Sequence, residues 1–149
     1  MFTRLALVVV FASMISGLGH AQSSKSGTPE EAKAMLEKAV EAVKADKTKA
    51  LAMFNKGKGG FKDRDLYVFC ADASTGIETA HPTHRGRKLP EIKDAKGFAF
   101  GEEMMKTATE EKISEITYLW PTPSSEEPVE KLTYYTKVDD QICAVGAYK

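Results

Sequence analysis

The chain has 149 residues, and its 21 basic and 21 acidic side chains give a formal net charge of zero at pH 7. A nucleic-acid-binding domain needs a basic excess on one face, so this composition argues against a nucleic-acid partner. The length fits one domain large enough to bury a core of its own.

Residues 1–21 are predicted to be a secretory signal peptide. Arg4 supplies a positive charge, residues 5–15 are apolar, and Gly19 and Ala21 are small residues before the expected cut. The alternative is a retained membrane anchor, but the apolar run is shorter than the roughly 20 residues needed to span a bilayer. We therefore expect a mature chain that starts at Gln22, is periplasmic or secreted, and does not insert into the membrane after cleavage.

Residues 22–29 are expected to be a flexible leader, and residues 30–149 a single domain. The order Thr28, Pro29, Glu31 combines an N-cap, a proline in the first turn and a capping box, so a helix is predicted to start there. Apolar residues then recur at helical spacing. The pattern is interrupted at residues 46–48, which predicts a break and a second short helix before Gly57.

Residues 66–70 form an unbroken apolar run, which predicts a central strand that is buried on both faces. Residues 72–76 have the composition of a turn, and residues 77–80 return as a second strand. His81 and Pro82 end this hairpin because proline has no N–H for the sheet ladder.

The remaining elements are a helix over about residues 96–109, capped by Asp94, and strands at 113–120, 131–138 and 141–148. Residues 123–128 and 139–140 are expected to be turns. The element order lacks alternation of strand and helix, so it predicts an α+β domain with an antiparallel sheet and its helices gathered at one side.

Five separated motifs resemble the single Cache domain (type 2), an extracytoplasmic small-molecule sensing module of bacterial receptors. They are D-x-D-L-Y-V-F from Asp63, D-x-x-x-G from Asp72, A-H-P from Ala80, the run from Gly86 to Phe100, and Y-L-W-P-T-P followed by P-V-E-K-L-T-Y. The resemblance extends from about residue 30 to residue 148. It implies a PAS-like five-stranded antiparallel sheet, with the long N-terminal helix on one face and a ligand pocket on the other.

The resemblance also implies ligand-binding residues at six positions: Tyr67, His81, Tyr118, Trp120, Lys131 and Tyr134. Each has a structural alternative, since strand aromatics mostly pack in cores and a histidine at a strand end can hydrogen-bond a backbone carbonyl. Lys131 and Tyr134 are an odd number of residues apart, so a regular strand would direct them to opposite faces. Either a bulge intervenes, Lys131 precedes the strand, or one of the two is structural.

Cys70 and Cys143 are the two cysteines of the chain, and an oxidising compartment permits one bridge between them. The first and last strands are neighbours in the Cache sheet, so the resemblance implies this disulfide. The alternative is two separate buried thiols that behave as small apolar side chains.

We expect no cofactor, no metal and no enzymatic activity. His81 and His84 are spaced as H-x-x-H but have a proline between them and lack further ligands at metal-site spacing. None of the serines lies in a nucleophile elbow, and Asp94 and Glu102 stand where helix caps and solvated faces normally place acids.

The predicted function is therefore binding or sensing of a small organic molecule, an anionic carboxylate that Lys131 and His81 would neutralise. Family members continue into a membrane helix and a signalling domain, whereas this sequence stops at Lys149. We expect a module without a transmembrane or signalling domain of its own, which would work with a membrane receptor or sensor kinase. The alternative is an interaction-only domain that packs against a partner protein and binds no ligand.

Overall fold

The computed structural model describes residues 25–110 and 112–149, so the predicted signal peptide lies outside the described residues. This part of the chain contains two α-helices, α1 (Pro29–Lys56) and α2 (Phe100–Thr107), and one 3-10 helix, η1 (Leu89–Glu91). The strands are β1 (Lys62–Asp63), β2 (Leu66–Asp72), β3 (Glu78–Ala80), β4 (Ser114–Thr122), β5 (Ser125–Val138) and β6 (Gln141–Tyr148). None of the helices in these ranges is long and apolar enough to cross a lipid bilayer.

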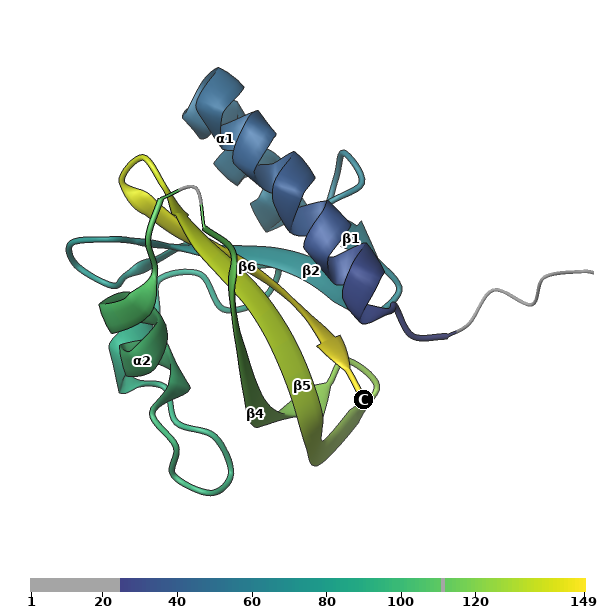
Figure 1. The fold of residues 1–149 in the computed structure, drawn as a ribbon. Coiled ribbons are helices and arrows are strands. Elements are labelled where there is room, and N and C mark those ends of the chain that lie inside the picture. Colours follow the sequence, from purple (N-terminus) through teal and green to yellow (C-terminus); the bar gives the residue numbers. More distant parts are fainter. Residues whose placement is uncertain (1–24, 111) are drawn as a thin grey trace, which may run out of the picture.

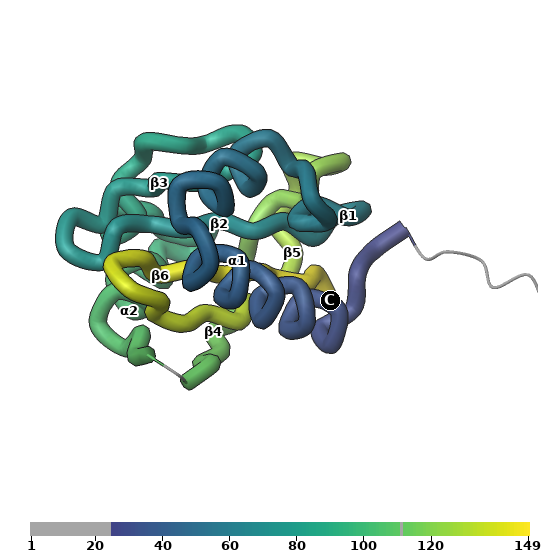
Figure 2. The backbone as a smooth tube through the Cα atoms, turned by 90° about the horizontal axis from the view of Figure 1, so that it is seen from above, coloured from purple at the N-terminus to yellow at the C-terminus, as the bar shows by residue number. Residues whose placement is uncertain are grey.

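The strands form one antiparallel sheet in the order β1-β2-β6-β5-β4, and β3 pairs with β2 outside this path (Figures 1 and 2). The pairing of β2 with β6 joins segments from opposite ends of the domain. The predicted α+β class and antiparallel sheet are confirmed. The sixth strand is the two-residue β1, which is too short to leave a sequence pattern.

The long helix α1 begins where the sequence predicted. Thr28 Oγ1 accepts a hydrogen bond from Glu31 N at 3.2 Å, and Glu31 Oε2 accepts one from Thr28 N at 2.8 Å, which completes the capping box. The expected break is a kink at Asp46, whose carboxylate caps Lys49 N at 3.0 Å. Gly57 ends the helix at φ 59°.

The start of the domain includes residues that the sequence assigned to the leader. Gly27 is buried and donates its N–H to Asp65 Oδ1 at 2.6 Å, and the neighbouring Thr28 and Pro29 cap and begin α1. Gly27, Thr28 and Pro29 therefore contact the rest of the domain.

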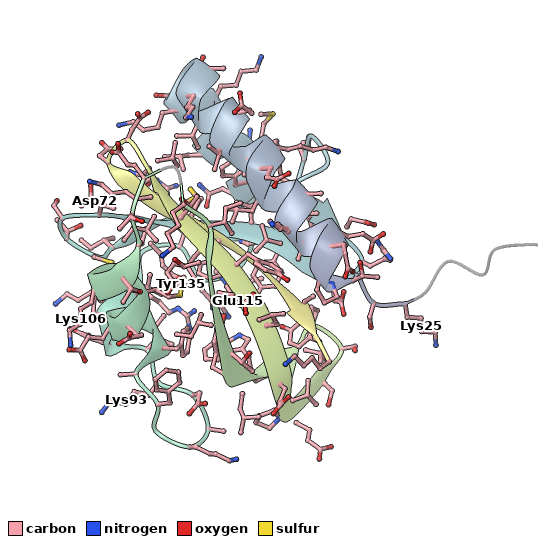
Figure 3. The ribbon with its side chains drawn as sticks, in the orientation of Figure 1. Lys25, Asp72, Lys93, Lys106, Glu115 and Tyr135 are labelled. Atoms are coloured by element: carbon pink, nitrogen blue, oxygen red, sulfur yellow. A yellow bond between two sulfur atoms is a disulfide. The ribbon has the colours of Figure 1, made fainter. Side chains whose placement is uncertain are left out.

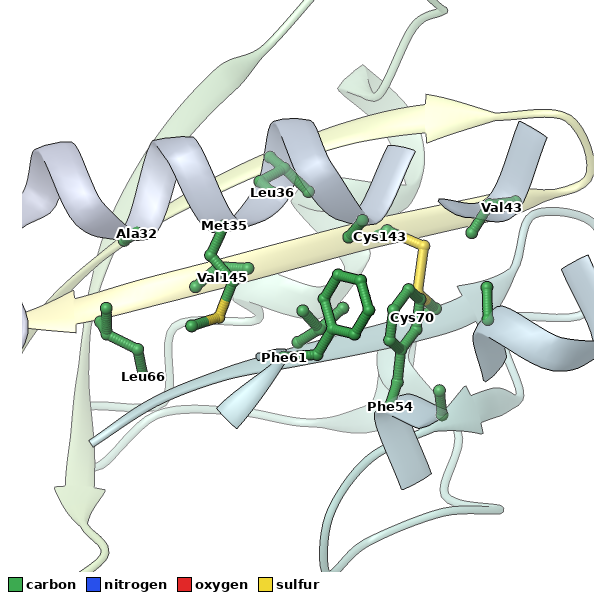
Figure 4. Packing of buried hydrophobic residues seen from close by; sticks show 14 of the residues in the cluster. Ala32, Met35, Leu36, Val43, Phe54, Phe61, Leu66, Cys70, Cys143 and Val145 are labelled. Carbon is green, nitrogen blue, oxygen red and sulfur yellow. A yellow bond between two sulfur atoms is a disulfide. The ribbon is translucent and has the colours of Figure 1, made fainter. Parts of the chain in front are cut away.

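Two apolar cores lie on opposite faces of the sheet, because side chains alternate along each strand. Leu66, Val68 and Cys70 of β2 pack beneath α1, with Phe54 and Val43 among their neighbours (Figure 4). Tyr67, Phe69 and Ala71 of the same strand pack on the other face with η1 and α2. Helix α1 therefore covers one face of the sheet, and η1 and α2 cover the other. The expectation that the helices gather at one side is wrong, because the order of elements in the sequence does not determine which face a helix covers.

A disulfide joins Cys70 on β2 to Cys143 on β6 beneath α1, as Figure 4 shows. The two residues are directly opposite each other in the antiparallel ladder, with their Cα atoms 4.1 Å apart. The predicted pairing is confirmed.

Other boundaries differ from the sequence-based expectation. Asp94 does not cap a helix: its carboxylate accepts hydrogen bonds from Lys96 N at 2.8 Å and Phe98 N at 2.9 Å within a loop, and from Leu119 N on β4 at 3.1 Å. The helix after it is therefore shorter than predicted, starting at Phe100. Strand β5 starts at Ser125, inside the predicted turn, because Ser125 pairs with Thr122 of β4 and Pro128 with Pro121.

Candidate ligand-binding site

Two adjoining cavities lie on the sheet face opposite α1, and Tyr67, His81 and Trp120 line both. The outer cavity has a volume of about 470 Å³. Its other lining residues are Lys62, Pro82, Thr83, His84, Pro121, Thr122, Pro123 and Tyr148. The inner cavity measures about 10 Å³ and is lined mainly by aromatic and aliphatic side chains, with Glu78, His81 and Arg87 as its other members.

Lys131 is buried at the centre of β5, with 1% of its surface exposed. Its Nζ donates a hydrogen bond of 2.8 Å to Tyr67 Oη and lies 4.2 Å from the centre of the Tyr67 ring and 4.9 Å from that of Tyr148. Within the described residues, no acidic side chain forms an ion pair with it. Lys131 itself lines neither cavity, but both of these tyrosine rings line the outer one.

Gly146 on β6 makes room for this side chain. A Cβ atom at Gly146 would overlap with Lys131 and with Thr133 Oγ1. A glycine at this position thus allows a long cationic side chain to lie against the sheet backbone. Nothing in the sequence alone pairs the two residues, because they are on different strands.

His81 is buried at the end of β3, with 7% of its surface exposed. Its Nδ1 accepts hydrogen bonds from Thr83 N at 3.1 Å and His84 N at 3.0 Å, so the ring proton is on Nε2. Burial, and then the positive charges of His84, Arg87 and Lys131, lower the pKa of His81 to about 3. The imidazole is therefore neutral at pH 7, so His81 can offer the N–H of Nε2 to a ligand but not a positive charge.

Aromatic side chains form the wall of the inner cavity. Tyr118 and Phe100 are stacked face to face, with ring centres 3.7 Å apart, and Trp120 meets Phe100 edge-on at 5.4 Å. Tyr118 Oη accepts a hydrogen bond of 3.0 Å from Thr133 Oγ1, and burial raises its pKa. The structure thus brings Tyr67, His81, Tyr118 and Trp120 together around one cavity, and their role in ligand binding stays a prediction.

Tyr134 is on the other face of the sheet. It is partly buried against the core beneath α1 and is paired opposite Val145, a member of that core. The ladder between β5 and its neighbours is regular from Lys131 to Tyr134, without a bulge. Strand alternation therefore separates the two residues, and we assign Tyr134 to the structural core rather than to the site.

The sequence did not identify Phe100, Tyr148, Arg87 or Glu78 as members of this region. Glu78 is 2% exposed and pairs with Arg87 at 3.1 Å; burial raises its pKa, and the arginine opposes that shift. Arg87 also lies 5.9 Å from the centre of the Trp120 ring. Of these four residues, Tyr148 alone could have been found from the sequence. If the last two strands are paired so that Lys131 lies opposite Tyr148, the tyrosine lies beside the lysine.

Comparison with known proteins identifies the same fold. The family model described as single Cache domain 2 matches residues 5–148. The methyl-accepting chemotaxis protein McpP of Pseudomonas putida (strain KT2440) is 32% identical over 74 residues, which are 48% of this chain and 14% of that protein. The chain thus matches only a small part of that relative.

Solved structures are similar over most of the domain. A methyl-accepting chemotaxis protein from Vibrio parahaemolyticus superposes with a TM-score of 0.64 and 24% identity, covering 80% of this chain and 86% of that one. A Cache chemosensory domain solved as the structural basis for carboxylic acid recognition gives 0.62 and 23%, covering 80% and 91%. At these identities the likeness shows the fold alone.

Proposed function

Because the chain belongs to the single Cache domain 2 family, whose members are non-catalytic sensor domains, we propose that it binds a small carboxylate between its two adjoining cavities. In this proposal the hydroxyl of Tyr67 and the Nε2–H of His81 donate hydrogen bonds to the carboxylate. The ammonium of Lys131, behind Tyr67, supplies the positive charge. Trp120 and the inner aromatic wall contact the ligand's apolar tail.

The observation that carries this proposal is the buried ammonium of Lys131 without an acidic partner in the described part of the chain. Removing a charge from water is costly unless an opposite charge or several hydrogen bonds compensate. A hydroxyl and two aromatic faces compensate only partly. A bound anion would complete the compensation, so the site is electrostatically suited to one.

The hydrogen bond between Lys131 and Tyr67 explains how the charge could act on a ligand that Lys131 does not touch. A tyrosine hydroxyl has one proton to donate and can accept from other groups. Since Tyr67 Oη accepts from Lys131 Nζ, its own proton can be donated, either to the neighbouring Tyr148 side chain or to a ligand in the cavity. Polarisation by the ammonium strengthens that donation.

His81 supplies the second donor. In the described residues its Nδ1 is occupied by two backbone N–H groups and its Nε2 has no hydrogen-bond partner. The rings of Tyr67 and His81 are 5.1 Å apart, and both line both cavities. Two donors on neighbouring rings that line the same cavities suit the two oxygens of one carboxylate.

The setting proposed for this domain is the bacterial periplasm. The predicted signal peptide (1–21), the leader after it and the disulfide all fit an oxidising compartment outside the cytoplasm. Similar solved domains include the periplasmic sensor domain of a chemotaxis protein, with a TM-score of 0.60 and 22% identity. A membrane receptor or sensor kinase is the proposed partner.

A thermal-shift titration of the chain purified from Gln22 tests ligand binding. Acetate, propanoate and pyruvate would be compared with acetamide and propanamide, which have the same shape without the charge. A ligand at 100 times its dissociation constant adds about 2.7 kcal/mol of stability, which raises the melting temperature by roughly 8–12 °C for a domain of this size. We expect at least one carboxylate to do so and its amide not to. No shift from any carboxylate would contradict the proposal and favour the interaction-only alternative.

A further inference from the structure

Phe100 is one of the aromatic side chains that line the inner cavity. The side chain is 3% exposed, lines the inner cavity, and lies flat on Tyr118 with 3° between the ring planes. The cavity left beside it is about 10 Å³, at the lower limit of the space that one water molecule needs. In the described structure this ring therefore limits the size of the inner cavity.

The position of Phe100 is fixed by close backbone packing. Gly101, the next residue, lies so near the carbonyl oxygen of Leu89 that a Cβ atom would overlap with it. One turn further along α2, Met104 is fully buried in the same core. Loop residues before the helix are held by the carboxylate of Asp94, which also binds the backbone of β4 at Leu119 N. Phe100 thus has little freedom to move away from Tyr118 unless the α2 segment shifts.

The two cavities offer different surroundings to a tail. The inner one is lined by Phe69, Leu89, Ile92 and the aromatic wall, together with the ion pair of Glu78 and Arg87, whereas the outer one is lined by Lys62, Thr83, His84 and three prolines. A tail that enters the inner cavity meets aromatic and aliphatic side chains on most sides, which suits a short apolar group. From this placement we infer that Phe100 sets the upper limit on ligand size, so that the site accepts carboxylates with tails of one or two carbons and rejects longer or aromatic ones. This inference rests on the carboxylate site proposed above.

The variant Phe100→Ala tests it, because removing the ring leaves an apolar space next to Tyr118. Engineered apolar cavities of about 150 Å³ bind benzene, so the ring of phenylacetate should fit where the Phe100 ring was. We expect the unmodified protein to bind acetate or propanoate and to bind phenylacetate at least about tenfold more weakly. In Phe100→Ala, phenylacetate binding should improve by at least about tenfold.

Phe98→Ala is the matched control. Phe98 is two residues away in the same segment, but it is 42% exposed and lines neither cavity. Its removal should leave the relative affinities for acetate and phenylacetate unchanged. Should Phe100→Ala fail to fold, Phe100→Leu is used instead, because it retains a buried apolar side chain. Its affinity for pentanoate should be at least about tenfold higher than that of the unmodified protein.

The outcomes separate the two proposals. Absence of carboxylate binding to the unmodified protein would overturn the carboxylate site and, with it, the role of Phe100. If acetate or propanoate binds and the folded Phe100 variants select ligands as the unmodified protein does, the carboxylate site stands and the role of Phe100 is refuted. Equal affinity of the unmodified protein for acetate and phenylacetate would also refute it, since the tail would then lie in the outer cavity.

Discussion

Lys131→Met removes the buried ammonium and puts an unbranched apolar side chain in its place. The backbone of β5 and the packing of the side-chain stem against Tyr67 and Tyr148 should persist. Because Lys131 has no acidic partner among the described residues, the substitution leaves no buried carboxylate unpaired. We therefore expect a folded variant whose stability is unchanged or slightly increased.

The expected loss of affinity follows from the geometry. Lys131 Nζ is 2.8 Å from Tyr67 Oη, and a carboxylate accepting from that hydroxyl would lie about 2.7 Å further on. The two charges would then be about 5 Å apart, which corresponds to about 3 kcal/mol at an effective dielectric constant near 20. Water in the outer cavity reduces this value, so we expect a loss of about 1.5–3 kcal/mol, or roughly a 10- to 150-fold higher dissociation constant.

Isothermal titration of propanoate or acetate into the parent and the variant measures this difference, and thermal unfolding of both checks stability. Lys62→Met is the matched control, since Lys62 borders the outer cavity but is exposed, and an exposed charge is largely screened by solvent and salt. The control should change the dissociation constant by less than about threefold. Equal dissociation constants for the parent and Lys131→Met would remove Lys131 from the site and with it the main reason to expect an anion.

Three further predictions concern other parts of the chain. The pKa of His81 in the folded domain is about 3, below its ordinary value near 6.5, so between these pH values only the unfolded chain binds the proton, and the free energy of unfolding falls by up to about 1.4 kcal/mol per pH unit as the pH is lowered. In His81→Asn, whose Oδ1 can accept the same two backbone N–H groups, the free energy of unfolding measured in urea should depend less on pH between pH 7 and pH 4. An unchanged pH dependence would contradict the assignment. Replacing both Cys70 and Cys143 by alanine removes a cross-link between residues 73 positions apart, and in the chain-entropy model this should lower the free energy of unfolding by about 4 kcal/mol. A decrease of less than about 1 kcal/mol in denaturant unfolding would refute that estimate. Mass spectrometry of protein from the periplasm should find a chain that starts at Gln22, whereas full-length chain in the membrane fraction would contradict cleavage.

Features determined by local chemistry could be predicted from the sequence. Thr28 and Glu31 form the capping box within one helical turn, and Asp72 accepts hydrogen bonds from Ser74 N and Thr75 N inside the turn that it begins. Strand β6 has the predicted bounds, because the turn at Asp139, which adopts a positive φ of 52°, joins β5 to β6. In each case the partners are a few residues apart.

Features that depend on contacts between distant segments could not be predicted in this way. Asp94 is of a residue type that often caps helices, but its carboxylate accepts hydrogen bonds from loop N–H groups and from Leu119 N on β4. Phe100 lies within the helix predicted over about residues 96–109, and only its stacking on Tyr118 makes it part of the cavity wall. Figure 3 illustrates the same limit for Tyr135, which lies on the α2 side of the sheet and shares a hydrogen bond of 2.8 Å with Thr107, whereas Lys106 of that helix points outward.

The spacing of Lys131 and Tyr134 indicated that their side chains lie on opposite faces of the sheet, and the structure shows this. The odd separation conflicted with both residues lying in one pocket, and the regular ladder places Tyr134 beneath α1. Strand parity could therefore have excluded one residue of the pair. Deciding which one required knowing the face that α1 covers.

A crystal structure of the domain with bound propanoate tests the proposed site most directly. The proposal predicts the carboxylate oxygens within about 2.6–3.0 Å of Tyr67 Oη and His81 Nε2, with the Lys131 ammonium still bonded to Tyr67. The tail should point towards Phe100 and Tyr118. Propanoate bound elsewhere on the domain, or bound without contact to either Tyr67 or His81, would contradict it.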